Sequence, residues 1–309
     1  MRRSLAWSAF LSFVLATTSA PAQQPAYPRN EGPVVLLDAK YRNLLALRLR
    51  PSLIETFTND GYRVVEREGQ ITEQSLRDVK VMVSASPVSK QNALPTDLPP
   101  ATEAEFAAQV DAAWRLPTPS AYSASEIQAL VDWVHGGGAL LVVVDHMPFP
   151  GAARELTERF GFELANGHAI AAREEDRSSP VRFSRSDGSL ADHAITTGRN
   201  AAERVEAVET YGGAAFRLPA GGESLMTFGS GYVHFLPNVA WKFTADTPRE
   251  PIAGWSQGGV VRVGRGRVAV FSEASFFMAP PPNEIGSEIR KQNGQFLLNV
   301  AHWLSGLLN

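Results

Sequence analysis

Residues 140–144 are five apolar residues in a row, and this run limits the possible folds of the chain more than any other feature. A strand with one face in water alternates apolar and polar residues, whereas a strand buried on both faces does not. Strands of the second kind are typical of parallel sheets that carry helices on both sides. Asp145 and His146 follow the run directly. The sequence therefore predicts a central strand whose carboxyl end presents a carboxylate and an imidazole.

Helical patterns alternate with apolar runs over the first half of the chain. Residues 34–37 form an apolar run that ends at Asp38, and residues 51–60 carry apolar side chains at helical spacing, with Pro51 at the expected helix start. This alternation predicts a doubly wound, mostly parallel α/β sheet with helices on both faces. Between residues 162 and 262 helical spacing gives way to short strand-like runs, so we expect a β-rich elaboration in the second half.

The first 22 residues have the pattern of a secretory signal peptide: two arginines, an apolar run too short to span a bilayer comfortably, and small residues ending at Ala22. We expect cleavage there and an exported, periplasmic or extracellular chain; an uncleaved membrane anchor is the alternative. Residues 23–32 then form a linker and residues 33–306 a single domain. A proline-rich insertion, 87–122, interrupts that domain and lies either over a site or elsewhere on the surface.

Charge and composition argue against several classes of function. The chain has 29 basic and 32 acidic residues, a formal net charge of −3, so we expect no nucleic-acid partner. After signal cleavage no apolar run is long enough for stable membrane insertion. The chain has no cysteine, which excludes disulfides, thiolate metal sites and a cysteine nucleophile.

Polar residues follow several of the expected strands, and the carboxyl ends of parallel strands meet at one edge of a sheet. Carboxylates and an imidazole in one crevice there can bind a small polar ligand such as a carbohydrate, hold a divalent cation, or act as general acid and base. No local metal-ligand spacing supports the cation, so no cofactor is predicted. Each residue can instead cap a helix or tie a turn. The candidate ligand-binding residues are Asp38, Lys40, Asn43, Ser84, Ser86, Asp145, His146 and Glu273, of which Asp145, His146 and Glu273 are also candidate catalytic residues.

Residues 254–258, Gly-Trp-Ser-Gln-Gly, fit the G-x-S-x-G nucleophile elbow of secreted hydrolases, with Ser256 as nucleophile. That elbow requires a buried strand before the serine and a helix after it. The preceding residues are polar and contain prolines, and a strand pattern follows. Glu273 and His302 would complete a triad, although His302 belongs to a helix that mostly packs the core. The sequence favours a loop at the sheet edge over an elbow.

Two groups in the β-rich half are weaker candidates. His193 and His234 lack a second metal ligand at suitable spacing, so both are expected in turns or on the surface. Four aromatic residues are either an aromatic platform for a sugar ring or part of the core. These are Trp241, Trp255, Tyr232 and Phe235.

Several phrases taken together resemble exported bacterial proteins of the class I glutamine amidotransferase-like superfamily, near its GldG-like and ThuA-like branches. They are ALLVVVDHMPFPGAA (139–153), HAITTG (193–198), GRGRVAVFSEASFF (264–277) and NGQFLLNVAHWLSG (293–306). The resemblance covers roughly residues 33–306 and implies a flavodoxin-like sheet, but no agreed activity.

True amidotransferases of this superfamily carry a cysteine in the turn after the strand that corresponds to 140–144. This chain has Asp145-His146-Met147 there, so glutamine hydrolysis by that route is not available. Our leading hypothesis is an exported, cysteine-less, non-catalytic domain that binds a small polar ligand or a partner protein at the strand ends. The alternative is a secreted hydrolase with a carboxylate, histidine or metal site or, less favoured, with Ser256 as nucleophile.

Overall fold

The computed structural model describes residues 24–40, 44–90, 92, 117–278 and 288–309. The predicted signal peptide, Asn43 and the helix pattern inside the proline-rich insertion lie outside the described residues. Within the described residues, no helix is both long enough and apolar enough to cross a membrane.

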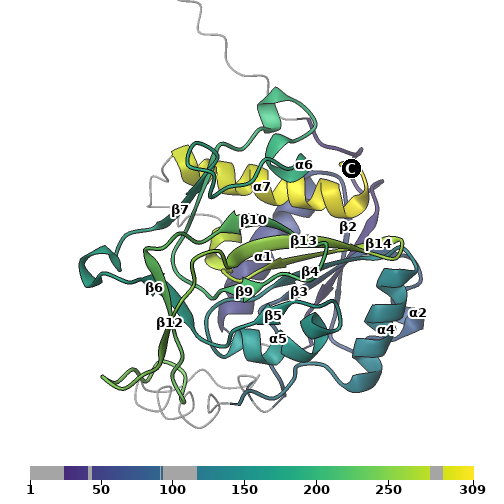
Figure 1. Ribbon diagram of the computed structural model, residues 1–309. Coiled ribbons are helices and arrows are strands. Elements are labelled where there is room, and N and C mark those ends of the chain that lie inside the picture. Colours follow the sequence, from purple (N-terminus) through teal and green to yellow (C-terminus); the bar gives the residue numbers. More distant parts are fainter. Residues whose placement is uncertain (1–23, 41–43, 91, 93–116, 279–287) are drawn as a thin grey trace, which may run out of the picture.

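A mixed sheet of nine strands forms the centre of the fold (Figure 1). Its first five strands are parallel and follow the spatial order β2-β1-β3-β4-β14, in which the helical connections are long enough to bring each strand back in the same direction. Antiparallel strands extend the sheet beyond β14. The parallel strands are β1 (Val34–Asp38), β2 (Arg63–Arg67), β3 (Val79–Ala85), β4 (Ala139–Val143) and β14 (Gly266–Phe271); the others are β5 (Glu163–Leu164), β9 (Phe216–Arg217), β10 (Glu223–Thr227) and β13 (Ser256–Val263).

Helices cover both faces of this sheet, each over its own hydrophobic core. On one face α1 (Leu44–Asn59) and α7 (Glu288–Ser305) pack side chains such as Phe57 and Phe296 against Leu37. On the other face lie α2 (Glu73–Leu76), α4 (Ala124–His135) and α5 (Phe149–Glu158), with Leu130 packed against Leu36 (Figure 1). Leu36 and Leu37 are neighbours in β1, and successive side chains of a strand point to opposite faces. The fully apolar strands are explained by these two cores.

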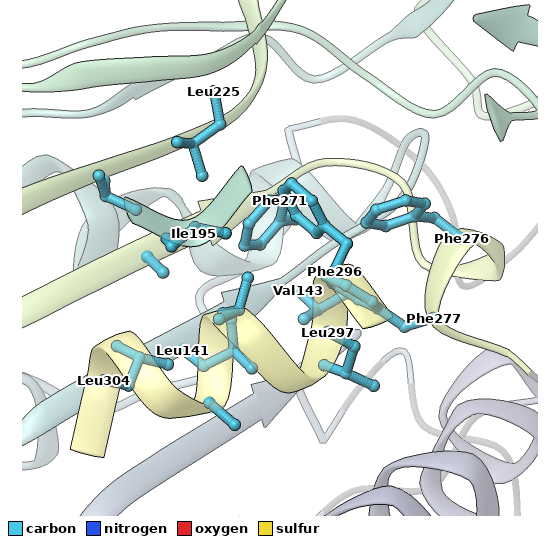
Figure 2. Close-up of a cluster of buried hydrophobic side chains, with 14 of the residues drawn as sticks. Leu141, Val143, Ile195, Leu225, Phe271, Phe276, Phe277, Phe296, Leu297 and Leu304 are labelled. Atoms are coloured by element: carbon cyan, nitrogen blue, oxygen red, sulfur yellow. The ribbon is translucent and has the colours of Figure 1, made fainter. Parts of the chain in front are cut away.

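Figure 2 shows the core beneath the ends of β4 and β14, where four phenylalanine rings gather around α7. The ring centroid of Phe271 lies 5.1 Å from that of Phe277 and 5.7 Å from that of Phe296. Phe276 and Phe277 belong to the short 3-10 helix η3 (Ser275–Phe277), which Ala274 separates from Glu273. This packing holds the turn after β14 against the helix layer.

The second half of the chain adds smaller antiparallel sheets, so the predicted fold class, with its β-rich elaboration, is confirmed. One sheet has the order β12-β11-β6 and the other pairs β7 with β8. Their strands are β6 (His168–Ala171), β7 (Val181–Ser184), β8 (Ala207–Thr210), β11 (Tyr232–Phe235) and β12 (Arg249–Pro251); the helical turns nearby are η1 (Glu174–Asp176), α6 (Ala194–Thr197) and η2 (Ala201–Glu203).

The expected helix start at Pro51 is wrong, because α1 begins at Leu44 and contains Pro51 in its interior. A proline in a helix interior removes one backbone hydrogen bond. Buried Ala46, Leu49 and Leu53 lie on one stripe that runs past the proline, and their burial against the sheet offsets that loss. Tertiary packing has overridden a local start signal.

Candidate functional site

The structure divides the predicted site residues into two clusters at the carboxyl edge of the parallel sheet. Asp38 and Ser84 stand two residues after Leu36 and Met82, which belong to the core beneath α4. Asp145 and Glu273 stand two residues after Val143 and Phe271, which belong to the core beneath α7. Because a strand repeats every two residues, the two pairs follow opposite faces of the sheet.

The first cluster is built around the phenol of Tyr122, which is buried just before α4. Its hydroxyl donates to Asp38 Oδ2 at 2.8 Å and lies 2.7 Å from Ser84 Oγ. The backbone N–H of Lys40 donates to the other oxygen, Asp38 Oδ1, at 3.1 Å. Burial raises the pKa of Asp38, and the bond from Tyr122 offsets part of that rise. Asp38 is therefore already satisfied by the protein.

Lys40 connects this cluster to α4. Its Nζ lies 2.5 Å from Glu126 Oε1, and both side chains are almost entirely buried. Burial alone would raise the pKa of Glu126, but the bonds from Lys40 and from the Ser123 N–H lower it on balance. Glu126 also closes the predicted capping box with Ser123. The ion pair thus fixes the loop after β1 to the start of α4.

Ser86 occupies a tight turn after β3. It is buried, its backbone has φ 48, and its N–H donates to Val143 O at 2.6 Å. A positive φ is uncommon for a residue other than glycine and marks a sharp change of chain direction. Ser86 joins the ends of β3 and β4.

The second cluster contains Asp145, His146 and Glu273. Asp145 Oδ2 accepts the backbone N–H of Ala274 at 3.0 Å, and Oδ1 accepts that of His146 at 2.7 Å. His146 Nδ1 lies 2.7 Å from Met147 O, and since a carbonyl can only accept, that nitrogen carries the proton. The second ring nitrogen, Nε2, lies 3.3 Å from Asp145 Oδ1. Asp145 therefore ties the turn after β4 to the turn after β14.

Glu273 is held by the turn that follows it. Its Oε1 accepts the Ser275 N–H at 3.0 Å, and its Oε2 accepts the Phe276 N–H at 2.8 Å. Only 3% of Glu273 is exposed, and burial together with the nearby Asp145 carboxylate raises its pKa to about 8. At neutral pH Glu273 therefore carries a proton.

Aromatic and imidazole rings form the solvent side of the second cluster. The ring centroid of Trp241 lies 4.3 Å from that of His146 and 5.2 Å from that of His168. The ring centroid of Phe243 lies 6.0 Å from that of Trp241. Trp241 is 43% exposed, and its backbone has φ 65. A large side chain in this left-handed region is costly and persists only where the surroundings impose it. We call Trp241, Phe243, His146 and His168 the ring wall.

His234 is fully buried in β11, so the expectation of a turn or surface position is wrong. The pairing of β11 with β6 and β12 encloses its ring. Burial, with a smaller effect from His168, lowers its pKa to about 3, and it is neutral. His193, by contrast, caps α6 in a turn, as expected, through Nδ1, which accepts the Ile195 N–H.

The four aromatic residues considered as a platform do not share one surface. Trp241 belongs to the ring wall. Phe235 packs against Phe243 of that wall, with their ring centroids 5.8 Å apart. Trp255 instead lies beneath the guanidinium of Arg217, at 4.4 Å, and Tyr232 packs against Phe228. Only part of the set can contribute to one binding surface.

Ser256 is the first residue of β13, and its hydroxyl donates to Ser224 Oγ at 2.8 Å. A strand follows the serine where the elbow requires a helix. His302 Nε2 lies 2.8 Å from Asp60 Oδ2, and its other nitrogen lies 3.9 Å from Glu203 Oε2. The three residues of the proposed triad therefore have other partners.

No group of three acidic or histidine side chains in the described part of the chain is arranged to hold a metal ion. Sequence reasoning also missed two groups that the site uses. Tyr122 stands beside the capping box, but nothing in its spacing indicated the bond to Asp38. His168 lies in a short strand without a local motif, and only the pairing of β6 brings it to His146.

The geometry defines the class of fold first: an α/β fold with a flavodoxin-like parallel sheet and added antiparallel sheets. Among solved structures, the N-terminal domain of mmIFT52 has a TM-score of 0.57 at 14% identity, over 88% of this chain and 97% of that chain. At this identity the likeness shows the fold alone.

Two further neighbours are similar over most of both chains. A ThuA-like protein from Bacteroides uniformis has a TM-score of 0.44 at 10% identity, over 93% of this chain and 95% of its own. A cytoplasmic protein from Salmonella typhimurium LT2 has a TM-score of 0.45 at 12% identity, over 88% and 99%. No family model and no curated protein matches the sequence.

Proposed function

We propose that this chain is an exported protein that binds a carbohydrate at the ring wall, beside the carboxyl ends of β4 and β14. The observation that carries the proposal is Trp241, which is 43% exposed and is held in a left-handed backbone conformation against two imidazoles. Membership of the class I glutamine amidotransferase-like superfamily, near its GldG-like and ThuA-like branches, is part of the proposal and rests on the sequence motifs.

A sugar ring has an apolar face of C–H groups and a rim of hydroxyls, so its binding sites combine an aromatic ring with nearby polar groups. Trp241 and Phe243 supply the rings, and Phe243 is 41% exposed. His146 and His168 supply ring nitrogens beside them. This combination favours a hydroxylated ligand over a purely apolar one.

The two carboxyl groups support binding more readily than catalysis. Asp145 and Glu273 are nearly buried, and all four of their oxygens accept backbone N–H groups. They act as positioning residues, since Asp145 orients the turn that carries His146 and ties it to the turn after β14.

The test is affinity electrophoresis in native gels that contain one polysaccharide each, from a panel of neutral and acidic polymers. The wild-type chain should be retarded in at least one gel, and Trp241→Ala should lose most of that retardation. Val65→Ala is the matched control, because Val65 is similarly exposed, at 48%, on the edge strand β2. Equal retardation of both variants would refute the ring wall as the binding surface.

A secreted hydrolase is the second candidate, and the raised pKa of Glu273 beside Asp145 favours it, because acid and base pairs have environments that separate their pKa values. Release of chromophore from nitrophenyl glycosides, abolished in Glu273→Gln and in Asp145→Asn, would support this candidate over binding alone. Labelling of Ser256 by a fluorophosphonate would support the serine form.

A further inference from the structure

A cavity of about 300 Å³ lies behind the ring wall, between β6, β11 and the loops that flank β7 and β8. His168 belongs to both the cavity and the ring wall, since it lines the cavity and its ring packs against Trp241. Ligand pockets span about 300–1,000 Å³, so this volume has room for one sugar-sized ring rather than for a chain of them. The lining residues used below are His168, Asp176, Arg177, Tyr211, Gly212 and Tyr232.

The wall of this cavity contains a ring nitrogen that makes no hydrogen bond to the described residues. It is His168 Nδ1, which is buried. A buried polar atom without a hydrogen-bond partner destabilises the folded protein, so a hydrogen bond from a ligand hydroxyl to this nitrogen would be favourable. Burial, reinforced by His146, lowers the pKa of His168 to about 4, so at neutral pH the ring is uncharged.

Gly212 keeps space beside this imidazole. Its backbone has φ 124, and a Cβ at this position would come within 2.8 Å of His168 Cε1 and 3.6 Å of Nδ1. Any other residue would therefore fill the space along that edge of the ring. The glycine and the unpaired nitrogen are independent observations at the same place.

The remaining groups favour an uncharged, hydroxylated ligand. Asp176 and Arg177 bring one negative and one positive charge to the wall, which cancel. A carboxylate accepts hydrogen bonds and a guanidinium donates them, and a hydroxyl group can do both. Tyr211, which is 47% exposed, and Tyr232 add aromatic surface.

We propose that this cavity binds a single neutral sugar unit, either a free monosaccharide or the terminal residue of a chain whose next unit lies on the ring wall. A hydroxyl of this unit donates to His168 Nδ1. The proposal rests on the proposed carbohydrate-binding function and adds to it the recognition of chain ends and the exclusion of acidic sugars.

Isothermal titration with methyl glucoside, methyl galactoside and methyl mannoside, each paired with its uronic acid, tests the proposal. At least one neutral sugar should bind, and its uronic acid should bind about tenfold more weakly or not at all. His168→Phe keeps a ring against Trp241 but removes the acceptor, and it should weaken the neutral sugar about tenfold. Tyr211→Ala, at the exposed position, is the second variant in case His168→Phe unfolds, and Val65→Ala is the control.

Three outcomes would overturn the cavity proposal: no neutral sugar binds, a uronic acid binds as well as its neutral partner, or both cavity variants bind as the wild type does. Polysaccharide retardation that depends on Trp241 would survive each of these, so the proposed function would stand. Loss of Trp241 dependence would refute the proposed function instead. The two failures are therefore distinguishable.

Discussion

Glu273→Gln should change how the stability of the protein depends on pH. The folded protein keeps a proton on Glu273 up to about pH 8, whereas an unfolded chain releases it near the ordinary glutamate pKa of 4.5. For a group whose pKa is raised by folding, the stabilisation is fully present below the unfolded pKa and is lost as pH rises through the folded pKa. The wild-type protein should therefore lose stability between these two pKa values.

The difference between the two pKa values sets the magnitude. Each pKa unit corresponds to about 1.4 kcal/mol, so a rise from 4.5 to about 8 limits the loss to about 5 kcal/mol. We therefore expect a loss of about 3–5 kcal/mol between about pH 4.5 and about pH 8.

Urea unfolding followed by tryptophan fluorescence, repeated over this pH range, measures the loss. Glutamine cannot titrate, so the variant should show a flatter profile, although its amide NH₂ opposes a backbone N–H and lowers stability at every pH. Glu155→Gln, on the exposed side of α5, is the matched control and should keep the wild-type slope. Parallel profiles for the wild type and Glu273→Gln would refute the assignment of the proton to Glu273.

Three further predictions concern the core, the first cluster and the N-terminus. Phe296→Ala should lower the free energy of unfolding by about 3–5 kcal/mol in urea denaturation, because the ring is fully buried among Phe271 and Phe276. Tyr122→Phe should cost about 1–3 kcal/mol by the same measurement, since it removes the donor to Asp38, and an unchanged midpoint would contradict that role. Chain secreted by a bacterial host should begin at Gln23 by N-terminal sequencing, and an intact Met1 would contradict signal cleavage.

The fold could be predicted because its signals are local. The apolar run at 140–144 and the capping box at Ser123 each determine an element within a dozen residues, and the order of elements then limits the topology. The predicted start of α1 was wrong for the opposite reason. The burial of Leu49 and Leu53 against the sheet, which is a tertiary contact, determines where the helix begins.

The candidate site was harder to predict. The position of a residue at the end of a strand shows which edge of the sheet it lies at, but not which face of the sheet its side chain points to. Asp38 and Asp145 both follow parallel strands, yet Asp38 bonds to Tyr122 before α4 while Asp145 bonds to Ala274 after β14. A shift of one residue in where a strand ends transfers a side chain to the other face. Trp241 lies in a turn between β11 and β12, and His168 lies in β6; the pairing of these added strands is long-range and has no local signal.

The turn after β4 bears on the proposed superfamily membership. The glutamine amidotransferases that the sequence resembles carry a reactive cysteine at the corresponding turn, and such a nucleophile must be exposed to a substrate. Asp145 instead is 4% exposed and uses its two oxygens to join the backbones at His146 and Ala274. A carboxylate employed in this way stiffens the edge of the sheet and holds the imidazole of His146 beside Trp241. Rigid placement of rings reduces the entropy lost when a ligand binds, so this use of Asp145 favours the proposed binding at the ring wall.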